Sequence, residues 1–126
     1  MTIGCTTTKK SLMNSNVLNG TWTPIKQEMV GKQLPSIVFQ TQKLIISDTT
    51  YIFTAESVDK ANLKYKNGQM DIYGKEGVNI GKHFPAIYKL VKDQLTICYN
   101  LKGDSYPAEF ETKSIAGLFL SVFKKN

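Results

Sequence analysis

The chain has few side chains suited to nucleophilic or metal chemistry, and they lie far apart in the sequence. His83 is the only histidine, and Cys5 and Cys98 are the only cysteines. A nucleophile needs a base and a group that orients the base, and a metal site needs several matched ligands, yet no such spacing surrounds His83. Glu109 and Glu111 would share one face of an extended segment, which is typical of solvated carboxylates. We therefore predict a non-enzymatic protein without metal or cofactor, with His83 in an exposed loop.

The positive charge of the chain comes entirely from lysine. All sixteen basic residues are lysines, and the formal net charge is +6. Arginine supplies the planar, bidentate group that recognises phosphate and guanine, so its absence disfavours a nucleic-acid partner. The lysines are scattered and often alternate with apolar residues, as on the solvated face of a sheet.

The elements that would position these groups are short strands. From Gly20 onward, runs of alternating apolar and polar residues are separated by turn signals, of which Asn67-Gly68 is the strongest because both positions accept a positive φ. The runs span residues 21–30, 42–47, 50–55, 61–66, 69–73, 85–91, 94–101, 108–113 and 117–124. Short connections require antiparallel neighbours, and closure removes exposed edges. We predict an all-β protein: a polar tail over residues 1–19, then one up-and-down antiparallel β-barrel of eight or nine strands over 20–126.

The period of two along each run assigns side chains to the barrel interior. The expected inner face comprises Leu44, Ile46, Tyr51, Phe53, Ala55, Leu63, Tyr65, Met70, Ile72, Tyr88, Leu90, Leu95, Ile97, Tyr99, Leu101, Leu118, Leu120 and Val122. Cys98 and Phe119 would then point outward. A barrel of this size is either filled by its own side chains or holds one small ligand, and both alternatives stay open here.

If a cavity exists, we expect a small hydrophobic or amphipathic ligand whose orientation is fixed by tyrosine hydroxyls. The expected lining residues are Tyr51, Phe53, Leu63, Tyr65, Met70, Ile72, Tyr88, Leu90 and Ile97. The rival interpretation is a filled barrel that acts as an interaction or inhibitor module through its loops. Residues 76–84 (EGVNIGKHF) would be the contact loop, because they form a long connection with apolar side chains.

A set of short motifs in a fixed order connects the chain to a known family. The motifs are Gly20-Thr21-Trp22, Glu28, the GKQLP segment from Gly31, the IYKLVKDQLTICYN segment from Ile87, and Pro107-Ala108-Glu109-Phe110. In this combination the chain resembles a bacterial lipocalin-like domain family from Leu18 to Lys113. The resemblance implies a calyx-like barrel, in a family whose function is largely unassigned.

The same resemblance suggests roles for three residues. Gly20 and Trp22 belong to the Gly-x-Trp signature, in which the tryptophan plugs one end of the barrel. A basic residue at the end of the last strand covers that tryptophan, and Lys124 would take the place of the usual arginine. The family usually has an arginine before the Pro-x-x-Phe motif, but Tyr106 stands there, so a role tied to that arginine is not carried over.

The tail contains a possible lipidation site. Thr2-Ile3-Gly4-Cys5 resembles the end of a bacterial lipoprotein signal, and a polar tether follows Cys5, although Thr2 departs from the usual leucine and no apolar region precedes it. A lipidated Cys5 would anchor the protein in the bacterial cell envelope, at the periplasm or outer membrane; the alternative is an ordinary tail cysteine. Because no run approaches ~20 apolar residues, a membrane would be reached only through this anchor.

Overall fold

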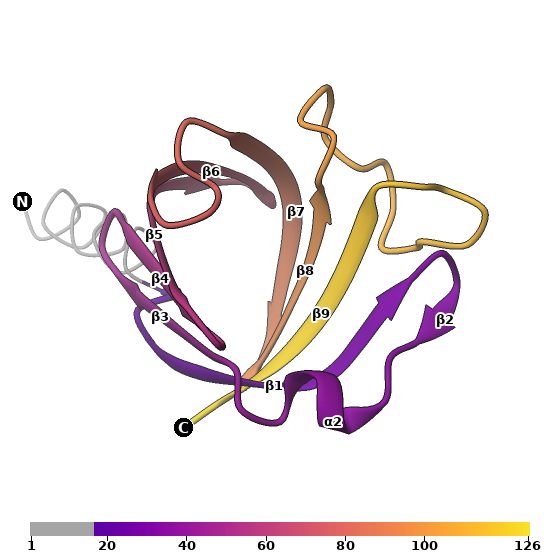
Figure 1. Cartoon of the computed structure of the whole chain (residues 1–126), viewed down its shortest axis with the longest axis horizontal. Helices are drawn as coiled ribbons and strands as arrows, with labels where there is room; N and C mark the ends of the chain where they lie inside the picture. The colour runs from indigo at the N-terminus through magenta and orange to yellow at the C-terminus, as the bar shows by residue number, and fades with distance from the viewer. Residues whose placement is uncertain (1–16) are drawn as a thin grey trace, which may run out of the picture.

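The computed structural model describes residues 17–126, which form a closed antiparallel barrel of eight strands with one extra strand (Figure 1). The predicted all-β, up-and-down barrel is thereby confirmed. The barrel strands are β1 (Gly20–Met29), β3 (Lys43–Ser47), β4 (Thr50–Thr54), β5 (Val58–Lys66), β6 (Gln69–Glu76), β7 (His83–Val91), β8 (Gln94–Asn100) and β9 (Leu118–Lys125). The short β2 (Lys32–Gln33) pairs with the end of β1, and α2 (Ser36–Phe39) is a single turn between β2 and β3.

Strand β1 closes the barrel because it pairs on both sides. Its first residues pair with β3, and residues from Trp22 onward pair with β9. The register with β9 shifts between Pro24 and Lys26. Proline has no N–H to donate to a ladder, so an irregularity is expected at this position. Strand β1 pairs with β9 on both sides of this shift, so the closure is continuous from Trp22 to Met29.

The Asn67-Gly68 hairpin forms as predicted. Asn67 and Gly68 have φ values of 51° and 83° and connect β5 to β6, with Tyr65 opposite Met70. Asparagine and glycine are the residues that tolerate two successive positive φ angles at low cost, as a two-residue turn of this hand requires. The turn therefore fixes the register in which the apolar faces of β5 and β6 meet.

The prediction of a strand at 108–113 is wrong. These residues lie in the long connection between β8 and β9, which consists of turns and bends. Phe110 packs against an apolar cluster on the outer face of β8 and β9, and the buried Thr112 accepts a hydrogen bond from the Gly31 N–H at 2.9 Å. The alternating pattern thus reflects a loop that docks on the barrel through Phe110 and Thr112.

The inner face assigned to the last strand is also wrong. Phe119, Ser121 and Phe123 lie opposite Tyr99, Ile97 and Leu95 of β8, and both phenylalanines pack in the interior core. Leu118 and Leu120 instead join Cys98 in the outer cluster, covered by the β8–β9 connection. Because β9 is apolar on both faces, alternation alone did not reveal which face was inside.

Trp22 fills the end of the barrel at which β1 begins. The indole is 1% exposed, and its Nε1–H donates to the Leu18 carbonyl at 2.9 Å. Leu18, assigned to the tail, is itself fully buried in the interior core. The lysine over the indole is Lys125, whose Nζ lies 5.8 Å from the ring centroid, and not Lys124 as expected. Since Phe123 points inward, a period of two places Lys125 on the same side and Lys124 outside.

Gly20 begins β1 with a φ of 146°, a conformation that L side chains rarely adopt. A Cβ atom at this position would lie 2.8 Å from Lys125 Cε. Glycine therefore fits both the backbone conformation and the close approach of the lysine that crosses the Trp22 ring.

Cys98 is fully buried between the outer face of β8 and the β8–β9 connection, and burial raises the pKa of its thiol to about 11. At pH 8 only about 0.1% of such a thiol is ionised, against roughly a quarter for an ordinary cysteine. We expect iodoacetamide to modify Cys98 at least about 100-fold more slowly in the native protein than in urea. Mass spectrometry of peptides that separate Cys98 from Cys5 measures this ratio. Comparable rates in both conditions would contradict the buried position.

Candidate functional site

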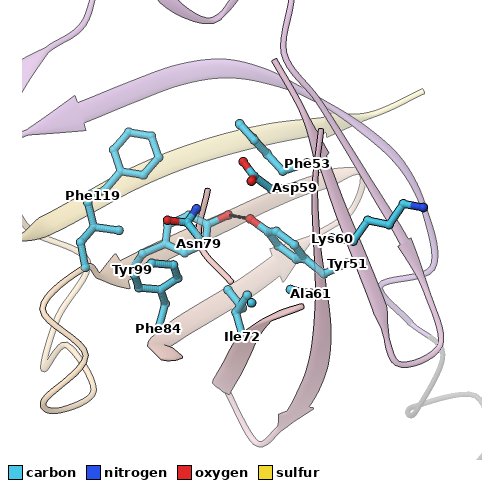
Figure 2. A pocket seen from close by; sticks show the side chains of 12 residues that line it. Tyr51, Phe53, Asp59, Lys60, Ala61, Ile72, Asn79, Phe84, Tyr99 and Phe119 are labelled. Carbon is cyan, nitrogen blue, oxygen red and sulfur yellow. Dashed lines mark hydrogen bonds between the residues drawn. The ribbon is translucent and has the colours of Figure 1, made fainter. Parts of the chain in front are cut away.

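A cavity of about 130 Å³ lies among the side chains shown in Figure 2. It is at the opposite end of the barrel from Trp22. Its position follows from the strand directions, because β4 and β8 end and β7 and β9 begin at this end of the barrel. Five aromatic side chains from four strands face it: Tyr51, Phe53, Phe84, Tyr99 and Phe119. The barrel is therefore filled at one end and hollow at the other.

The volume of the cavity limits its contents. An engineered apolar cavity of about 150 Å³ in another protein holds one benzene molecule. A space of about 130 Å³ is consequently matched to a single small ring or a compact branched group and is too small for a long acyl chain. Ala61 and Gly74 contribute to this space because their side chains occupy little of it.

Two tyrosines form a polar pair within the aromatic lining. The hydroxyl oxygens of Tyr51 and Tyr99 lie 2.8 Å apart and share a hydrogen bond. Burial raises the pKa of both hydroxyls above the ordinary value of 10, so both stay neutral at physiological pH. Each hydroxyl satisfies part of the other's hydrogen-bonding capacity, and the remaining lone pairs can accept from a bound molecule.

The β6–β7 connection borders the mouth of the cavity. Asp59 Oδ1 accepts the Val78 N–H at 2.9 Å, and the Gly74 N–H donates to the Lys82 carbonyl at 2.8 Å. A Cβ atom on Gly74 would overlap the carbonyl of Asn79, so a glycine is needed where the connection crosses β6. Figure 2 shows Asn79 among the aromatic side chains. The connection is thus fastened across one side of the mouth.

Three of the nine residues expected to line a cavity do so: Tyr51, Phe53 and Ile72. The other six pack elsewhere in the interior: Leu63, Met70 and Ile97 are buried in the core, and Tyr65, Tyr88 and Leu90 pack against it. Tyr65 belongs to the filled end, because its hydroxyl accepts the Leu18 N–H at 3.3 Å, and its ring meets Tyr88 edge-on at 5.6 Å.

Several lining residues were missed by the sequence analysis. Phe84 lies opposite Ile72 in β7, which begins two residues earlier than expected, and Phe119 was assigned to the wrong face of β9. Asp59 precedes the expected start of the following strand, and Asn79 lies in a loop. Phe84 follows the alternation of Ala86 and Tyr88, so an upstream extension of that pattern is the signal that could have found it.

A second cluster of polar side chains lies on the outer face of β6 and β7. His83 opens β7 and is half-buried, so its expected position in an exposed loop is wrong. Its Nε2 lies 2.7 Å from Asp71 Oδ1, and its ring stacks on Tyr73 at 4.5 Å. The Tyr106 hydroxyl donates to Asp71 Oδ2 at 2.7 Å, which raises the pKa of that hydroxyl. Asp71 therefore contacts His83 of the neighbouring strand through Oδ1 and holds the β8–β9 connection against the barrel through Oδ2.

No group of three or more His, Cys, Asp or Glu side chains in residues 17–126 could hold a metal ion. No helix there is long and apolar enough to cross a membrane. The proposed lipidation site at Cys5 lies outside the described residues.

The chain was also compared with family models, curated proteins and solved structures. None of the three comparisons finds a match, so the lipocalin-like family stays a prediction and the site must be interpreted from its own residues.

Proposed function

We propose that this protein is a non-enzymatic binding module that takes one small, compact apolar or amphipathic molecule into the cavity at the open end of the barrel. The observation that supports this most directly is the aromatic lining around an unfilled space of about 130 Å³. A core that served only to stabilise the fold would be expected to close such a space, because interiors pack to the density of organic crystals.

The energy of apolar burial sets the affinity that the cavity alone can supply. Burying a body the size of an aliphatic or aromatic side chain contributes about 1.5–3 kcal/mol. A dissociation constant of 1 mM corresponds to about 4 kcal/mol. Polar groups near the mouth must therefore add to the binding energy of any ligand held more tightly than the millimolar range.

Filling the cavity tests the proposal. We expect Ala61→Leu to place three extra carbon atoms in the space and to reduce binding of benzene and toluene at least about tenfold, because ligand and side chain would occupy the same volume. Chemical shift changes of the Phe84 and Phe119 rings measure binding. Ala108→Leu, in the exposed part of the β8–β9 connection, is the matched control and should bind as the unmodified protein does.

The thermal unfolding midpoint of both variants checks that they are folded. Unchanged binding of toluene by folded Ala61→Leu would contradict the assignment of the site. If benzene, toluene and a wider panel of small hydrophobic molecules leave the spectrum of the unmodified protein unchanged, the cavity is not a binding site.

The rival function, protein interaction through the β6–β7 connection, is favoured by one specific observation. Val78 and Ile80 at its tip are 71% and 66% exposed, although both are large and apolar. Exposed apolar side chains grouped in a loop are typical of a contact with another protein. If the protein acts only through this loop, small molecules should not change the stability of the folded state. A ligand bound in the cavity would instead stabilise the folded state by mass action.

A further inference from the structure

We propose that the cavity selects a small organic cation, whose ammonium group lies against the Asp59 carboxylate and whose apolar body lies among the aromatic rings. This inference rests on the proposed function of the cavity and adds the charge of the ligand. Its starting point is the combination of one carboxylate with five aromatic side chains around a small space.

Asp59 is the charged group that faces the cavity. Lys60 is the other charged side chain among the residues that line the cavity. Lys60 extends away from the aromatic cluster, and its Nζ lies 3.9 Å from Glu76 Oε1 on the neighbouring strand (Figure 2). The lysine is therefore engaged outside the cavity, which leaves Asp59 as the charged side chain directed into the lining.

The Asp59 carboxylate is both held in place and available. Its Oδ1 accepts the Val78 N–H at 2.9 Å, which fixes the side chain at the mouth. Among residues 17–126, Oδ2 has no hydrogen-bond or ion-pair partner. Figure 2 places the carboxylate beside Phe53 and near Tyr51. A carboxylate with one free oxygen at the edge of an apolar space is suited to contact with a positively charged group.

The aromatic rings favour the same class of ligand. The face of an aromatic ring carries a partial negative charge and attracts cations within about 6 Å, most strongly where water is excluded. Tyr51, Phe53, Phe84, Tyr99 and Phe119 supply such rings on several sides of one space. An anionic head group would meet the carboxylate at the mouth and the negative ring faces inside, and both would oppose its binding.

The net charge of +6 acts in the opposite direction, but over a longer range. At physiological ionic strength the interactions between exposed charges are largely screened beyond about 8 Å. A cation in direct contact with Asp59 and the rings is governed by these near neighbours. Higher salt should therefore weaken the distant repulsion from the lysines more than it weakens the contact itself.

A matched pair of ligands separates charge from shape. Choline carries a trimethylammonium group, and 3,3-dimethylbutan-1-ol has the same shape with a neutral carbon in place of the nitrogen. We expect choline to bind at least about tenfold more tightly than the neutral alcohol, as measured by chemical shift titration of the full chain at pH 7. In Asp59→Asn the preference for choline should fall at least about threefold, to the part that the aromatic rings supply, with the dissociation constant of the neutral alcohol unchanged.

Asparagine at position 59 keeps an oxygen that can accept the Val78 N–H, so the loop contact is preserved in the variant. Asp93→Asn is the control, because it removes the same charge in the β7–β8 turn at the filled end of the barrel, where the Asp93 carbonyl accepts the Lys125 N–H. It should leave the preference for choline unchanged.

The outcomes separate this inference from the proposed function. Equal affinity of the unmodified protein for choline and the neutral alcohol would overturn the cation preference while leaving the cavity as a binding site. A preference for choline that is unchanged in Asp59→Asn would overturn the role of the carboxylate. If neither ligand binds and toluene does not bind, the proposed function fails together with the inference.

Discussion

Replacing Trp22 with alanine is expected to lower the free energy of unfolding by about 3–5 kcal/mol, the range typical of a buried tryptophan or phenylalanine. The indole is 1% exposed and occupies the filled end of the barrel, so its removal leaves a large void beneath Leu18. The Leu18 carbonyl would also lose the Nε1–H donor at 2.9 Å. Urea unfolding followed by far-UV circular dichroism measures the loss without relying on tryptophan fluorescence.

Two further variants define what Trp22 contributes. Trp22→Phe keeps a ring in the core but leaves the Leu18 carbonyl without its donor, and we expect an intermediate loss of about 1–3 kcal/mol. Ile37→Ala serves as the control, because Ile37 is 73% exposed and its truncation should change stability by less than about 0.5 kcal/mol. A loss below 1 kcal/mol for Trp22→Ala would show that the indole is not the main closure of this end.

The protein is expected to lose stability steeply above pH 10. Burial raises the pKa of Tyr51 and Tyr99 in the folded state, whereas the unfolded chain ionises these groups near pH 10. Above that pH the unfolded state has released protons that the folded state still binds, so the free energy of unfolding falls as pH rises. Each fully protected tyrosine contributes about 1.4 kcal/mol per pH unit, which is about 2.7 kcal/mol per unit for the pair.

Urea unfolding at pH 9, 10, 11 and 11.5 measures this slope. The double variant Tyr51→Phe, Tyr99→Phe removes both hydroxyls together, so that no buried hydroxyl is left without its partner at 2.8 Å. Its stability should decline less steeply than that of the unmodified protein, by about 2.7 kcal/mol per pH unit. Identical slopes in the two proteins would mean that these hydroxyls are accessible to solvent in the folded state.

The barrel could be predicted because local chemistry specified its hairpins. Asn67-Gly68 requires a tight turn whatever surrounds it, and the alternating runs on either side then meet with their apolar faces aligned. The closure of the barrel could be predicted from the number of strands and the shortness of their connections. Neither the turn nor the closure had to be predicted from a contact between distant parts of the chain.

Alternation failed where both faces of a strand are covered. Leu118 and Phe119 are both apolar, and the choice between them depends on the docking of Phe110 on the outer cluster. This contact joins the β8–β9 connection to the sheet and has no local signature. Because Phe119 was assigned to the outer face of β9, it was also left out of the expected cavity lining.

The position of the cavity along the barrel could not be predicted from the sequence pattern either. Inward-facing residues could be recognised from their period of two, but which end is filled depends on Trp22 and on Leu18, a residue outside any strand. Asn79 reaches the mouth through a loop that crosses β6 at Gly74, and Asp59 reaches it from β5, opposite Phe53 of β4. Such features arise from tertiary geometry, which a single sequence does not encode in local patterns.

Both described ends of the chain meet at the filled end of the barrel. The Leu18 carbonyl accepts from Trp22, and the Asn126 N–H donates to the Thr21 carbonyl at 2.9 Å. The mouth lies at the far end of strands such as β8, whose seven residues span about 20 Å. Attachment of the C-terminal end to a sensor chip or a fluorescent fusion partner would therefore place the linkage at the filled end and leave the cavity facing free solution.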